Sequence, residues 1–69
     1  MEPLTSQLAS NVQLDTIFFE ICLKKNRRPI ATLEKKDGKY ELTLPPDFIT
    51  VDGIEFLKLL QKGIEELEM

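Results

Sequence analysis

The chain has 69 residues, of which 42% are hydrophobic and 30% charged, and its formal net charge is −3. A chain this short forms one domain at most and buries only ~60% of its unfolded surface, so a partner or a second copy would add needed stability. One Cys and no His exclude an internal disulfide and argue against a structural zinc site.

No apolar run exceeds three residues, as in Ile17–Phe19, which is far too short to span a membrane. The first ten residues lack the basic and apolar regions of a signal peptide. The free Cys22 is typical of a reducing compartment. We therefore expect a cytoplasmic protein that is not associated with a membrane and has no cofactor.

Residues 1–12 are polar and weakly patterned. Leu4 and Leu8 lie four apart, as on one face of a short helix, and Ser10 and Asn11 then interrupt the pattern. The prediction is a flexible arm or a short helix, and an arm that reaches onto a second subunit is the alternative.

Residues 14–24 include the segment LDTIFFEICL, whose β-branched and aromatic content predicts a strand. Side chains alternate between the two faces of a strand. One face would carry Ile17, Phe19, Ile21 and Leu23, and the other Phe18, Glu20 and Cys22. A helix is the competing interpretation, because Leu14, Phe18, Ile21 and Cys22 also form a helical stripe.

The segment Lys24–Arg28 predicts a turn without glycine. A loop of three or five residues would place Leu23 opposite Ala31 and Ile21 opposite Leu33, which joins two apolar rows into one surface. A two-residue loop would set Ile21 against a polar residue, so the odd loop is favoured.

Residues 29–36 and 39–44 predict a hairpin around Asp37-Gly38, the pair preferred where both turn residues need positive φ. This register sets Lys36 opposite Lys39 and Leu33 opposite Leu42. The apolar face would hold Ala31, Leu33, Tyr40, Leu42 and Leu44. Phe18, Cys22 and Ile30 would lie on the opposite face, where a second layer or a second copy would cover them, or where they are scattered exposed residues that need no partner.

Two prolines end the last strand, and a helix that starts at Thr50 or Asp52 is predicted over about residues 52–68. Asp52 and Glu55 have the spacing of a capping box. The stripe toward the sheet would be Ile54, Leu57, Leu60, Ile64 and Leu67. Phe56 and Leu59 flank it, so the apolar arc is wider than one sheet contact requires. Gly63 would be explained by a second helix or subunit crossing near Phe56, Leu59 and Gly63, or it is a tolerated surface glycine.

The predicted fold is therefore α+β: a three-stranded antiparallel β-meander with one C-terminal amphipathic helix packed on one face. Residues 13–69 would form this single small domain. The predicted self-association surfaces comprise Phe18, Cys22, Ile30, Phe56, Leu59 and Gly63.

Charge is segregated along the chain, with a balance of +5 in residues 24–39 and −5 in residues 40–69. The basic group would be a solvated edge or a patch at one end of the sheet for an anionic partner. Its members are Lys24, Lys25, Arg27, Arg28, Lys35, Lys36 and Lys39.

The sequence argues against an enzyme. There is no His to act as a general base, and Cys22 lies mid-strand without an activating partner. The three glycines form no phosphate-binding loop.

Two resemblances concern Ala31–Leu67, which contains KKDGKYELTLPPDF followed by an amphipathic helix. This segment resembles the hairpin-then-helix part of HicB-type antitoxins, small proteins that block a toxin ribonuclease. The glycine and threonine usual before that family's helix are matched loosely, by Thr50 and Gly53. It is also similar in layout to the single-strand-binding, positive-cofactor type of transcriptional coactivator, whose helix dimerises. Neither resemblance assigns a functional residue.

We expect a small non-enzymatic regulatory or accessory module that binds another protein and forms a homodimer. The alternative is a single-stranded nucleic-acid-binding protein that uses the basic hairpin region 24–39. A stable domain without a site of its own is the third possibility.

Overall fold

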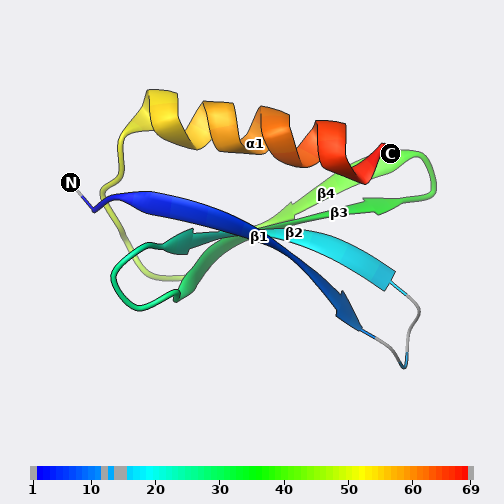
Figure 1. Cartoon of the computed structure of the whole chain (residues 1–69), viewed down its shortest axis with the longest axis horizontal. Coiled ribbons are helices and arrows are strands. Elements are labelled where there is room, and N and C mark those ends of the chain that lie inside the picture. The colour runs from blue at the N-terminus through cyan, green and yellow to red at the C-terminus, as the bar shows by residue number, and fades with distance from the viewer. Residues whose placement is uncertain (1, 12, 14–15, 69) are drawn as a thin grey trace.

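The computed structural model describes residues 2–11, 13 and 16–68. These residues form an antiparallel sheet in the order β1-β2-β3-β4 with the helix α1 across one face (Figure 1). The elements are β1 (Leu4–Asn11), β2 (Thr16–Leu23), β3 (Pro29–Lys36), β4 (Lys39–Thr43) and α1 (Gly53–Leu67). The α+β class with a β-meander is confirmed, but the predicted number of strands is wrong.

The additional strand is β1, which replaces the arm or short helix predicted for residues 1–12. It pairs with β2 along its whole length, from Leu4 opposite Leu23 to Asn11 opposite Thr16. A spacing of four residues suits one face of a helix, but because four is even it also suits one face of a strand. The spacing of Leu4 and Leu8 therefore could not distinguish the two.

The hairpin of β3 and β4 has the predicted register, with Lys36 opposite Lys39 and Leu33 opposite Leu42. Asp37 and Gly38 have φ values of 53° and 78°, as the tight turn requires. β4 ends at Thr43, one residue before the predicted end.

The pairing of β2 with β3 is shifted by two residues from the prediction. Ile21 faces Ala31 and Phe19 faces Leu33, so the apolar rows still share one face. Cys22 faces Pro29, which leaves Ile30 as the extra residue of a β-bulge. The bulge turns Ile30 into the core, where it is 6% exposed, and so the prediction that Ile30 lies on the opposite face is wrong.

α1 begins at its predicted cap. The Asp52 side chain accepts a hydrogen bond of 2.8 Å from the N–H of Glu55. The Glu55 carboxylate accepts a second one of 2.8 Å from the N–H of Leu4. The Asp52 half of the capping box is therefore present, whereas the carboxylate of Glu55 ties the start of α1 to β1.

The core lies between α1 and the middle of the sheet. Its fully buried members are apolar: Phe19, Ile21, Leu23, Ile30, Ala31 and Leu33. Gly63 is the buried residue of α1, and it lies directly against the ring of Phe19. A Cβ added at position 63 would lie 2.6 Å from Cδ2 of Phe19. The close approach that Gly63 permits is thus made by the chain's own β2.

The stripe with which the helix faces the sheet matches the predicted one only at Leu60 and Leu67. Phe56, Leu59, Leu60 and Leu67 pack against the core together with Gly63. Ile54, Leu57 and Ile64 were predicted to face the sheet, but they are 66%, 65% and 40% exposed. The contact of Gly63 with Phe19 explains the difference. At about 100° per residue, Leu57 and Ile64 lie roughly a quarter to a third of a turn round the helix from Gly63, and Ile54 lies on the far side.

Gly63→Ala should destabilise the protein by about 2 kcal/mol, although alanine is the better helix former, because the added methyl group overpacks the Phe19 ring. Urea unfolding followed by circular dichroism measures this. The matched control is Gly53→Ala, where nothing lies within 4 Å of the new Cβ and stability should be unchanged or slightly higher.

Adding Phe19→Leu should make the cost of Gly63→Ala smaller than in the parent, since the smaller side chain yields space. A Gly63→Ala protein as stable as the parent would contradict the close contact.

Candidate functional site

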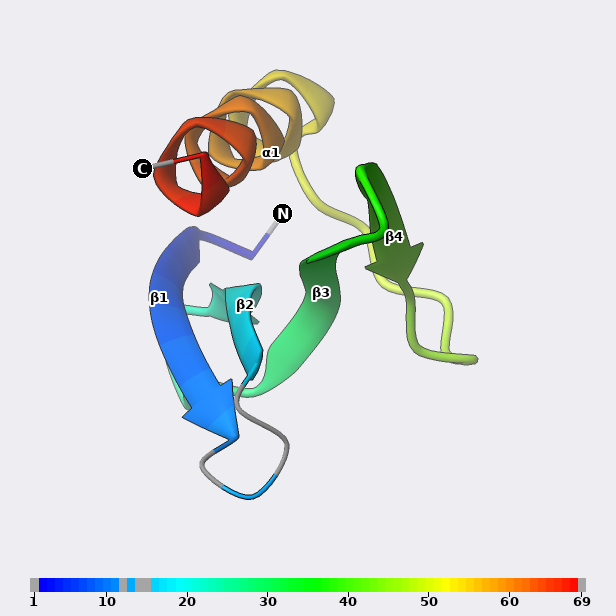
Figure 2. The ribbon, with the colours of Figure 1, turned by 90° about the vertical axis from the view of Figure 1, so that its right-hand side faces the viewer.

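α1 covers only part of the sheet, as Figure 2 shows. A helix with its side chains is about 10 Å across, whereas the outer strands of a four-stranded sheet lie about 14 Å apart. The hydrogen bond from Leu4 to Glu55 holds α1 toward the β1 side. The β4 side of the apolar face is consequently left uncovered.

An apolar flank occupies this uncovered side. It consists of Leu42 in β4, Leu44 just after it, and Leu57 and Ile64 in α1. Their exposed fractions are 42%, 59%, 65% and 40%.

The orientation of α1 assigns Leu57 and Ile64 to the β4 side. Successive residues of an α-helix are about 100° apart, which places both on the side opposite Glu55. On that same side, Glu68 accepts a 2.9 Å hydrogen bond from Lys35 in β3. The flank was missed because the sequence predicted all four residues as part of the core. The width of the helix's apolar arc was the available signal, since packing against one sheet face could not bury the whole arc.

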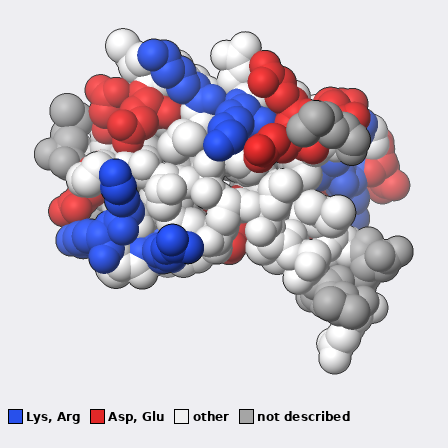
Figure 3. Space-filling model, viewed as in Figure 1, with Lys and Arg blue, Asp and Glu red and all other residues white. Residues whose placement is uncertain are grey.

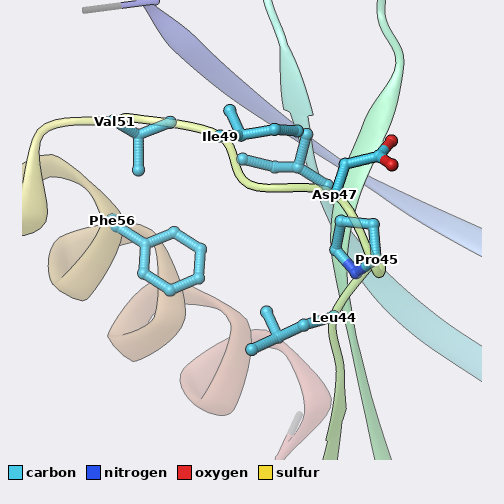
Figure 4. A pocket seen from close by; sticks show the side chains of 7 residues that line it. Leu44, Pro45, Asp47, Ile49, Val51 and Phe56 are labelled. Atoms are coloured by element: carbon cyan, nitrogen blue, oxygen red, sulfur yellow. The ribbon is translucent and has the colours of Figure 1, made fainter.

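A pocket of about 210 Å³ lies at one end of the flank (Figure 4). Leu44, Val51 and Phe56 direct their side chains toward it, from the strand exit, the connection and the helix. The complete lining is Ile30, Leu44, Pro45, Asp47, Ile49, Val51 and Phe56. Small-molecule sites usually exceed about 300 Å³, so this pocket suits a single anchoring side chain.

The pocket offers little chemistry. Asp47 is its charged lining residue, and the carboxylate points away from the cavity (Figure 4). That carboxylate forms an ion pair with Arg28. Because the remaining lining is apolar, the pocket can bind an apolar group but brings no set of polar groups to bear on it.

The seven basic residues do not form the predicted single patch. Consecutive turns of a meander lie at opposite ends of its strands, and the eight residues of β3 separate the two turns by about 25 Å. Lys24, Lys25, Arg27 and Arg28 belong to one end, and Lys35, Lys36 and Lys39 to the other. Figure 3 shows basic groups at both ends of the molecule.

Three of the seven basic residues are neutralised by acidic neighbours. Lys25 lies 3.2 Å from Glu2, Lys35 lies 2.9 Å from Glu68, and Arg28 pairs with Asp47. Within the described ranges, the other four, Lys24, Arg27, Lys36 and Lys39, form no ion pair.

The predicted self-association residues belong largely to the chain's own interior. Cys22 is fully buried and Gly63 contacts Phe19, while Phe56 and Leu59 pack against the core. Of the residues predicted for the second sheet face, Phe18 is half-buried there. Burial, reinforced by the Glu20 carboxylate, raises the pKa of the Cys22 thiol, so it is a poor nucleophile at neutral pH.

No three acidic or thiol side chains converge to hold a metal ion in the described part of the chain. Among those same residues, no helix has the length and apolar content to cross a membrane. No protein-family model, curated protein or solved structure matches the chain. The two resemblances of Ala31–Leu67 thus stay expectations from the sequence.

Tyr40 provides a test of the core next to the flank. Its ring packs against the core, and its buried hydroxyl has no hydrogen-bond partner in the described residues. Tyr40→Phe removes that desolvated group and should stabilise the protein by about 1 kcal/mol in urea unfolding. A loss of stability would mean that the hydroxyl has a partner in solution.

Proposed function

We propose that this protein is a small non-enzymatic regulatory or accessory module that binds other proteins and forms a homodimer in the cytoplasm. The observation that supports protein binding is the apolar flank with its adjoining pocket. Leu42, Leu44, Leu57 and Ile64 expose aliphatic surface on two elements that face the same side. Such surface next to a pocket is typical of a protein interface.

The shape of the flank favours a helical or extended apolar segment as the partner. One side of the segment would lie beside Leu57 and Ile64 of α1, and the other beside Leu42 of β4. A single apolar side chain would fill the pocket beside Leu44. The partner would thereby bury the strip that α1 is too narrow to cover.

Leu57→Lys should weaken partner binding without unfolding the protein, because Leu57 is 65% exposed. The control is Ile54→Lys, which alters an aliphatic side chain of α1 that is 66% exposed but lies about 60° further round the helix. Tagged protein is used to capture partners from a lysate of its host, and the affinity of each partner is then measured with purified proteins.

The expected loss with Leu57→Lys is about thirtyfold, corresponding to a residue worth about 2 kcal/mol. Binding by Ile54→Lys should stay within a few-fold of the parent. Equal capture of the same partners by both variants would refute the flank as the binding surface.

Single-stranded nucleic-acid binding remains the alternative proposal, and we place it at the turn of residues 24–28 because that end carries four basic residues and the other end three. It is supported by Lys24 and Arg27, which lie in the same turn as Lys25 and Arg28 and form no ion pair with a described residue. Tyr40 does not support it, because its ring packs in the core and Lys35 lies over it at 5.8 Å.

Gel retardation of a single-stranded oligonucleotide at low salt tests this alternative. If the turn binds phosphates, the paired change Lys24→Glu and Arg27→Glu should abolish retention, whereas Lys36→Glu with Lys39→Glu at the other end should not. Retention should also fall steeply with salt, in proportion to the phosphates neutralised. No retention by the parent protein at low salt would eliminate the alternative.

A further inference from the structure

The outer edge of β1 presents unpaired backbone groups. The N–H of Lys24 donates to the C=O of Pro3 at 3.0 Å, so Leu4 and Leu23 form a non-hydrogen-bonded pair of the antiparallel ladder. Every second residue from Leu4 onward therefore directs its N–H and C=O away from β2. Ser6, Leu8 and Ser10 are the others in this series.

The N–H of Leu4 is already occupied, because it donates to Glu55. In the described part of the chain, the outward N–H groups of Ser6, Leu8 and Ser10 have no such acceptor. The free part of the edge is therefore centred on Leu8. It lies in the half of β1 that extends away from α1 (Figures 1 and 2).

This edge lacks the usual protection against pairing. The β1 sequence LTSQLASN contains no charged residue and no proline. β4, at the other edge, has five residues, includes Lys39 and Glu41, and is soon followed by Pro45. Figure 3, which views the molecule from the β1 side, shows mostly uncharged surface along this strand.

Apolar side chains adjoin the same free segment. Leu8 is 51% exposed and Ile17 of β2 is 59% exposed. Both lie on the face that carries α1, since Leu8 is opposite Phe19 and Ile17 is opposite Ser10. Their exposed fractions show that α1 leaves much of both side chains uncovered, so a further strand beside Leu8 would bury apolar area as well as backbone groups.

We propose that β1 pairs antiparallel with β1 of a second copy, with Leu8 opposite Leu8 and Ser6 opposite Ser10. This specifies the interface of the homodimer and rests on that part of the proposed function. A second copy is the occupant because the free segment reads Ser-x-Leu-x-Ser, which matches itself when reversed about Leu8. A two-fold axis requires this self-complementarity, and the uncharged edge adds no like-charge repulsion.

The resulting dimer has one continuous sheet. About six backbone hydrogen bonds would form, two at each of three facing pairs. The two Leu8 side chains would meet at the centre on the helix-bearing face, with Ile17 of each copy beside them. The apolar flank at β4 would be left free at both ends of the dimer, available to other proteins.

Disulfide trapping tests the register. Facing residues of a hydrogen-bonded antiparallel pair have Cα atoms about 5.5 Å apart, within the range of about 4.4–6.8 Å for disulfides. Leu8→Cys should therefore give a covalent dimer under mild oxidation, at least tenfold faster than either Ser6→Cys or Ser10→Cys alone. A mixture of Ser6→Cys and Ser10→Cys chains should cross-link to each other.

The matched controls follow from the same register. Two Ser6→Cys chains would hold their cysteines about 14 Å apart, because the positions are offset by four residues. The parent protein supplies the other control, since its Cys22 is buried. Equal cross-linking by Ser6→Cys and Leu8→Cys would overturn the proposed pairing.

Sedimentation at about 50 µM separates failure of the interface from failure of the dimer. The parent should sediment at twice its 8.0 kDa mass. Leu8→Lys should be a folded monomer, and Leu57→Lys a dimer. A dimer that Leu57→Lys disrupts and Leu8→Lys does not would overturn this interface alone, whereas a monomeric parent would overturn the homodimer itself.

Discussion

The contact between Gly63 and Phe19 determines how the helix lies on the sheet. A side chain at position 63 would coincide with the aromatic ring, so α1 approaches β2 more closely at this point than any other residue would allow. The hydrogen bond from Leu4 to Glu55 holds the other end of the helix. These two contacts place α1 over the β1 side of the sheet and leave the apolar side chains next to β4 exposed.

The hairpin could be predicted because its determinants are local. Asp37-Gly38 specifies a two-residue turn, and the alternation on either side of it admits one register that keeps the apolar row together. The start of the helix could also be predicted, since Asp52 lies three residues before Glu55 and caps the helix. In both cases the residues that decide the structure are neighbours in the sequence.

The features that could not be predicted depend on contacts between distant residues. Leu4 and Leu8 suit a strand or a helix, and only β2 as a neighbour decides between them. The bulge at Ile30 shifts the register of β2 with β3 by one residue, and the length of the loop between these strands does not reveal that shift. The rotation of α1 depends on Phe19, forty-four residues before Gly63. The predicted stripe was consequently displaced, and the exposed Leu57 was assigned to the core.

The two edges of the sheet differ in the kind of contact they can make. At β1 the exposed groups are mainly backbone N–H and C=O, which any strand can pair with, and the absence of charge removes the barrier to self-pairing. At β4 the charged strand and the following prolines oppose backbone pairing, while Leu42 and Leu57 expose side chains that discriminate by shape. Pairing at β1 suits an identical copy because the Ser-x-Leu-x-Ser segment matches itself when reversed, whereas side-chain contact at β4 suits recognition of a different protein. Because α1 is held toward β1 and cannot cover both sides, the same constraint that stabilises the core also keeps these two surfaces separate.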